Sequence, residues 1–124
     1  MLRIALFFAL LALLAHPIPS RAKCILPAPD TDVEGLTPAN IEGKISGIKN
    51  NIVYIRAGKS SSTVAVRLPR GNLIYTAFGG DQDASQLRIG QTAAVWLVGC
   101  RRGHSRVPRA AYFQIYSADP NDHP

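Results

Sequence analysis

The amino-acid sequence predicts an all-β fold, a small barrel of five to six strands, with a two-sheet sandwich as the alternative. Short runs rich in Val, Ile, Tyr and Phe recur along the chain, and residues typical of turns separate them. After residue 22, no stretch shows the apolar spacing of a convincing amphipathic helix. The runs occupy residues 41–48, 52–56, 63–68, 73–78, 92–98 and 110–116.

Polar turns separate the first three predicted strands. β-branched residues open residues 41–48 and recur in residues 52–56, and the Lys-Asn-Asn turn at 49–51 predicts a hairpin, since Asn tolerates positive φ. Residues 57–62 form a polar loop. The alternation in residues 63–68 then predicts a third strand with one apolar face.

The next segment combines one strand with irregular structure. A Pro-Arg-Gly-Asn turn at residues 69–72 leads into a fourth strand at 73–78. Residues 79–83 predict a loop, because they hold only Gly, Asp and Gln. Residues 84–87 predict one helical turn with Asp83 as its cap.

The last two strands carry the strongest apolar signal. Residues 92–98 are the most apolar run, which favours a central strand. We expect Trp96 in this strand to be a core residue, together with Phe113 in the closing strand at 110–116. Residues 101–108 form the loop between the two strands.

Residues 1–22 predict a cleaved secretory signal peptide. Arg3 precedes the wholly apolar residues 4–15, and the small residues Ser20 and Ala22 stand three and one before the expected cut. The apolar run is shorter than the ~20 residues that a membrane-spanning helix needs, so a retained anchor is the weaker alternative. We therefore expect a periplasmic or secreted protein.

The two cysteines of the chain both follow the expected cleavage site. In an oxidising compartment, Cys24 and Cys100 predict one disulfide, which ties an extended leader at residues 23–40 to the domain. Lipidation of Cys24 is the alternative, but Lys23 stands where a lipoprotein signal has a small residue. Residues 117–124 are polar and hold two prolines, which predicts a flexible tail.

The order of glycines and apolar residues resembles that of OB-type barrels over about residues 38–100. The resemblance is to the oxyanion-binding barrels of the TOBE/Mop kind and to uncharacterised periplasmic OB-like domains, and it implies an OB-like barrel at residues 41–116. Two positions that hold Thr and Ser in the molybdate-binding barrels hold Gly80 and Asp83 here, and a carboxylate repels an oxyanion. The resemblance therefore implies the fold and not the ligand. The residues that carry it are Gly43, Ile45, Ile48, Val64, Val66, Leu68, Gly71 and 87–91.

One loop concentrates the basic residues of the domain. Arginine is the side chain best suited to bidentate capture of phosphate or carboxylate, and we expect at least three of the four arginines in this loop to be exposed. The alternative is a solvated loop that keeps a neighbouring edge strand soluble. The candidate binding residues are Arg101, Arg102, His104, Arg106 and Arg109.

Nothing in the sequence predicts catalysis, a metal site or a cofactor. The acidic residues lie in the leader and the turns rather than as a pair in an apolar setting. The Asp-containing residues 79–83 lack the ligand spacing and the closing Glu of a calcium loop. We therefore expect a non-enzymatic protein.

The sequence favours an exported binding module. Without residues 1–22 the formal net charge falls from +6 to +4, because Arg3 and Arg21 are removed, and this modest excess argues against a polycation. The expected partner is another exported or envelope protein, which the module could inhibit, or an anionic polymer or head group bound by the basic loop. One alternative is a structural accessory of an envelope or secretion assembly. A lesser one is single-stranded nucleic-acid binding, which would need exposed aromatic rings such as those of Tyr54, Tyr75 and Tyr112.

Overall fold

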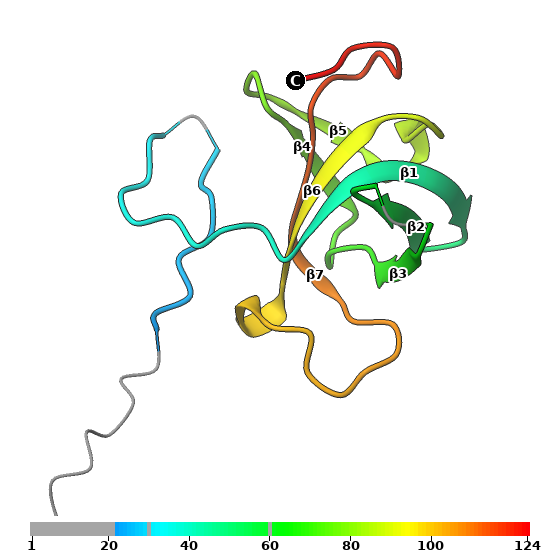
Figure 1. Ribbon diagram of the computed structural model, residues 1–124. Helices are drawn as coiled ribbons and strands as arrows, with labels where there is room; N and C mark the ends of the chain where they lie inside the picture. The colour runs from blue at the N-terminus through cyan, green and yellow to red at the C-terminus, as the bar shows by residue number, and fades with distance from the viewer. Residues whose placement is uncertain (1–21, 30, 60) are drawn as a thin grey trace, which may run out of the picture.

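A computed structural model describes residues 22–124 except 30 and 60, so the predicted signal peptide lies outside the described residues apart from Ala22. Within this part of the chain, two one-turn 3₁₀ helices, η1 (Ala84–Gln86) and η2 (Val98–Cys100), accompany seven strands (Figure 1). The strands are β1 (Ile41–Lys49), β2 (Ile52–Ala57), β3 (Thr63–Arg67), β4 (Leu73–Thr76), β5 (Asp81–Asp83), β6 (Thr92–Leu97) and β7 (Ala110–Ile115).

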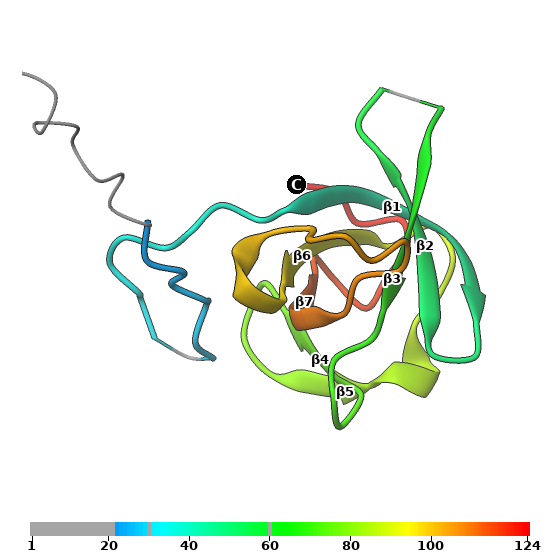
Figure 2. The ribbon, with the colours of Figure 1, turned by 90° about the horizontal axis from the view of Figure 1, so that it is seen from below.

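The described strands form one sheet in the order β3-β2-β1-β6-β7-β4-β5, which places β6 at the centre as the sequence predicts. Neighbours are antiparallel except β4 and β7, which are parallel. The sheet curls strongly (Figure 2). Its ladder is not closed, but a parallel bridge joins Arg67 to Arg109, and the Arg67 N–H donates to the Pro108 carbonyl at 2.8 Å.

The all-β prediction is confirmed, whereas the predicted count of five to six strands is wrong. The additional strand is β5, in a segment that the sequence predicts as a loop. Its pairing with β4, which sets Leu73 opposite Asp83 and Tyr75 opposite Asp81, uses backbone groups. Three polar residues at a sheet edge carry no apolar alternation, so the sequence gives no signal for this strand.

The hydrophobic core lies on the concave side of the curled sheet. Alternate residues of the strands face it and are fully buried, among them Val53, Ile55, Val95 and Phe113. Gly43 allows β1 and β2 to approach closely, because an added Cβ would overlap the carbonyl oxygen of Arg56. The predicted turn after β5 is also confirmed, since the Asp83 carboxylate accepts a hydrogen bond from Ser85 N at 2.8 Å.

A buried glutamine joins the start of β6 to the C-terminal segment. Gln91 is fully buried; its Oε1 accepts from Arg88 N at 2.8 Å, and its Nε2 donates to the Ala118 carbonyl at 2.9 Å. Both ends of the amide are thus satisfied, which burial requires. In contrast, Gln82 Nε2 on β5 is buried without a hydrogen-bond partner among the described residues.

Candidate functional site

The arginine loop, residues 101–109, projects from one end of the sheet between η2 and β7 (Figure 1). Gly99 and Cys100 both adopt positive φ, 71° and 53°, which turns the chain sharply away from β6. The loop therefore leaves the sheet instead of continuing its ladder.

Three of the four arginines in the loop, Arg101, Arg102 and Arg106, are exposed, as predicted, and so is His104. Arg109 differs from the others. It is half-buried, and its Nη1 donates to the Leu68 carbonyl at 3.1 Å beside the bridge between Arg67 and Arg109. Arg109 thus stabilises the junction of β3 and β7 and is not grouped with the free cations of the loop.

The exposed charges of the loop are not neutralised. Within the described part of the chain, none of Arg101, Arg102 and Arg106 has an ion pair. A shallow hollow of about 180 Å³ lies between Arg101, Arg102 and His104, and the 60%-exposed Val98 lines it. Guanidinium groups around a partly apolar hollow suit an anionic group with an apolar neighbour.

The two cysteines lie at disulfide distance, as predicted, with their Cα atoms 5.6 Å apart. This pairing fastens the leader beside the arginine loop. A second hollow surrounds the cysteines, and both Lys23 and Arg101 line it. The basic surface consequently extends onto the leader. Lys23 was not among the predicted binding residues, although its position next to Cys24 and the predicted disulfide would have placed it there.

The leader is fixed by hydrogen bonds as well as by the disulfide. Ile25 and Thr37 bond to each other twice, through Thr37 N to Ile25 O at 2.9 Å and Ile25 N to Thr37 Oγ1 at 2.8 Å. The Thr37 carbonyl also accepts from Trp96 Nε1 at 2.5 Å. Asn40 bonds to the end of β6 and to η2, because its side chain accepts from Leu97 N and donates to the Cys100 carbonyl. The leader is therefore held as a loop against the sheet.

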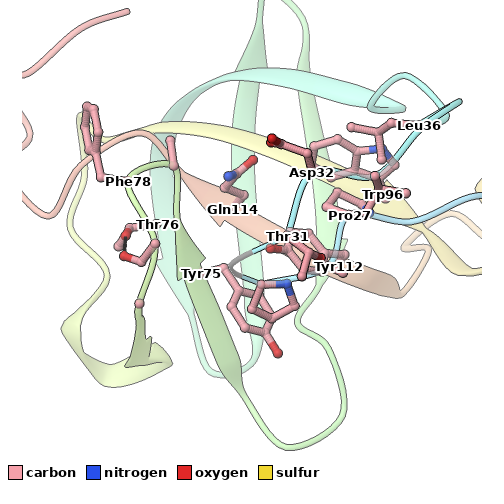
Figure 3. Close-up of a pocket in the computed structure, with 16 residues that line it drawn as sticks. Pro27, Thr31, Asp32, Leu36, Tyr75, Thr76, Phe78, Trp96, Tyr112 and Gln114 are labelled. Carbon is pink, nitrogen blue, oxygen red and sulfur yellow. Dashed lines mark hydrogen bonds between the residues drawn. The ribbon is translucent and has the colours of Figure 1, made fainter.

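Between this leader and the convex face of β4, β6 and β7 lies a groove of about 510 Å³ (Figure 3). The rings of Tyr75 and Tyr112 stack with centroids 4.5 Å apart, and Trp96 meets Tyr112 edge-on at 5.6 Å. At the other end, Phe78 is 74% exposed and packs edge-on against Tyr116. Sequence reasoning missed this groove, because its walls come from segments that are distant in the chain.

The groove also revises two expectations about aromatic residues. Trp96 is buried, with 5% of its surface exposed. It lies under the leader, however, and not in the hydrophobic core, because its neighbours Val95 and Leu97 take the positions that face the core. Tyr112, considered as an exposed residue for base stacking, is only 8% exposed. Tyr54 and Tyr75 are half-buried.

The segment compared with the oxyanion-binding barrels carries a negative charge. The backbone and side-chain hydrogen bonds from Ser85 lower the pKa of Asp83 below its ordinary value of 3.8. The Asp83 carboxylate is therefore ionised at neutral pH, and it would repel an oxyanion.

The described residues contain no group of three or more His, Cys, Asp or Glu side chains placed to hold a metal ion. None of their helices is long and apolar enough to cross a membrane.

Comparison of the chain with protein-family models, with curated proteins and with solved structures found no match.

Proposed function

We propose that this chain is an exported, non-enzymatic binding module, an OB-like barrel that binds an acidic partner through its arginine loop. The observation that carries the proposal is the set of exposed, unpaired guanidinium groups in one loop: Arg101 and Arg102 line its hollow, and Arg106 lies in the same loop. Lys23 adds a fourth cation beside the loop. A concentration of like charge at one end of a small domain attracts and orients an acidic partner.

Two features support the barrel and export parts of the proposal. The strand β7 pairs in parallel with β4, and the bridge between Arg67 and Arg109 brings the edge strand β3 to the start of β7, which suits an OB-like barrel. The cysteine pair at disulfide distance suits an oxidising compartment, as the signal-peptide pattern of residues 1–22 predicts.

The partner that we favour is an acidic face of another exported or envelope protein. The hollow beside the loop is shallow and includes the exposed Val98, so the surface combines charge with a small apolar contact. Interfaces between proteins commonly combine an apolar centre with a charged rim. Anionic lipid head groups and anionic polymers share part of this chemistry, and the experiment separates them from a protein partner.

The test compares two triple variants with equal loss of charge. The loop variant replaces Arg101, Arg102 and Arg106 by Ser, and the control variant replaces the exposed Lys49, Lys59 and Arg70 by Ser. Immobilised wild type and both variants are incubated with envelope protein extract, phosphatidylglycerol vesicles and polyglutamate. We expect the loop variant alone to lose most capture of protein, and wild-type capture to fall as salt rises past about 0.1 M.

Equal capture by all three proteins at low salt would contradict the binding role and leave a structural accessory as the better interpretation. Capture of vesicles or polyglutamate alone would contradict a protein partner and assign the loop to head groups or polymers. Loss of capture in both triple variants would show that total charge, and not the arginine loop, is responsible.

A further inference from the structure

The groove under the leader has a rigid aromatic floor. The stacked rings of Tyr75 and Tyr112 and the edge-on ring of Trp96 come from the adjacent strands β4, β7 and β6. Each ring limits the rotation of the next, and the hydrogen bond from Trp96 to Thr37 fixes the indole. A ligand that binds here loses little affinity to the ordering of side chains.

The charge of the groove is opposite to that of the arginine loop. Asp32 is the acidic residue in its wall, and no Lys or Arg is among its described lining residues (Figure 3). The chain as a whole has a net charge of +6, so a groove with an acidic and no basic lining residue differs from the rest of the molecule. The groove therefore favours a neutral or cationic ligand over an anionic one.

The leader shows what kind of group this aromatic surface accommodates. Pro27 and Pro29 both line the groove, and Figure 3 shows Pro27 beside Trp96 and Tyr112. Proline rings pack well on aromatic side chains, and aromatic-lined grooves bind proline-rich segments in their extended polyproline conformation. The chain's own prolines thus form one wall and leave the aromatic floor beside them for a second segment.

We propose that the groove binds an extended, proline-rich peptide that carries a lysine or arginine. Prolines of the peptide pack against the half-buried Tyr75 and the exposed Phe78, and its basic residue pairs with Asp32. The side-chain amide of Gln114 lies on the floor and has no hydrogen-bond partner among the described residues, so it is free to donate to a peptide carbonyl (Figure 3). A polyproline segment has unpaired carbonyls of this kind.

A sugar chain fits the groove less well. Sugar rings pack on open aromatic faces, but Tyr75 and Tyr112 each use one face to stack on the other. Trp96 is 5% exposed, and its N–H already donates to the Thr37 carbonyl. The floor of the groove therefore exposes ring edges and the gaps between rings, and not an open ring face on which a sugar could stack.

The test uses synthetic peptides and the single tryptophan of the chain. The probe is a fluorescent proline-rich peptide of about ten residues with two arginines at one end. Matched peptides replace the arginines by Glu, or the prolines by Gly. We expect the probe to shift the emission of Trp96 and to show polarisation that increases with protein concentration, and we expect both matched peptides to bind more weakly.

Two pairs of variants locate the binding site. Phe78→Ser should weaken binding about tenfold, whereas Ile89→Ser, which removes another largely exposed apolar residue outside the groove, should leave it unchanged. Asp32→Asn should weaken binding of the arginine peptide about two- to fivefold, whereas Glu34→Gln on the same leader should not. Circular dichroism of each variant checks that the sheet is intact.

The proposal is independent of the arginine loop, so the loop variant with three Ser substitutions should bind the probe like wild type. Absence of binding at about 1 mM peptide would overturn the proposal. Equal binding of the glycine peptide, or equal loss in Phe78→Ser and Ile89→Ser, would do the same. A shift of Trp96 emission by chitotetraose but not by the peptide would assign the groove to sugars instead.

Discussion

The leader and the arginine loop are both irregular segments at the same end of β6, yet they relate to the sheet in opposite ways. The leader is tied down by Cys24, by the paired Ile25 and Thr37, and by Asn40. The exposed part of the arginine loop, residues 101–106, contributes charge and few contacts. Both segments lack strands, so secondary structure does not distinguish them. Hydrogen bonds and burial do: they show that the leader belongs to the fold and that the arginine loop is available to a partner.

The largest expected effect tests whether the leader is part of the fold. Trp96→Ala removes a buried ring and the hydrogen bond to Thr37, and should lower the free energy of unfolding by about 3–5 kcal/mol. Urea unfolding followed by circular dichroism measures this, because the variant has no tryptophan emission. A loss under about 1 kcal/mol would show that the leader does not cover Trp96 in solution.

The next effect concerns the covalent tie. Replacing Cys24 and Cys100 together by Ser should lower stability by about 2–5 kcal/mol, because the unfolded chain then loses a long-range constraint. Thermal unfolding of the variant and of reduced wild type should agree. If wild-type protein has two free thiols and reducing agent does not change its stability, the disulfide does not hold the leader on the sheet.

A smaller loss of stability tests whether the Asn40 side chain helps to hold the leader on the sheet. Asn40→Ala leaves Leu97 N–H and the Cys100 carbonyl without their partner, and should cost about 1–3 kcal/mol. Ser105→Ala in the exposed part of the arginine loop serves as the control and should change stability by less than about 0.5 kcal/mol. Equal melting temperatures for both variants would mean that Asn40 does not fasten the leader.

The smallest expected changes in stability distinguish Arg109 from the three exposed arginines of the loop. Arg101→Ser, Arg102→Ser and Arg106→Ser should each change stability by less than about 0.5 kcal/mol. Arg109→Ser should cost about 1 kcal/mol, because its guanidinium donates to the Leu68 carbonyl at the junction of β3 and β7. Chemical denaturation of the four variants measures the difference, and four equal values would place Arg109 among the free cations.

Sequence patterns predict the strands of this protein much better than its surfaces. The six apolar runs correspond to six strands within about two residues at their ends, because alternation and turn residues act locally. The strand β5 gave no signal, since Asp81–Asp83 pairs through its backbone. The exposure of the arginines was predicted from their charge, whereas the half-burial of Arg109 depends on Leu68 in a distant segment.

The aromatic groove lay beyond sequence reasoning for a similar reason. Apolarity predicts that Trp96 is buried, but a buried ring at this position can face the core or lie beneath a covering segment. Which of these holds depends on the leader, whose position is set by contacts between residues about 60 positions apart. Local patterns cannot report such contacts.

The spacing of the cysteines also determines the order of events when the protein is made. They lie 76 positions apart, and β1 to β6 all fall between them. In a chain synthesised from its N-terminus, Cys24 remains a thiol until Cys100 has been added. Bond formation is therefore a late step, and a nascent chain interrupted before residue 100 presents a free thiol that can exchange with any disulfide it meets, releasing one of that disulfide's sulfurs as a thiol.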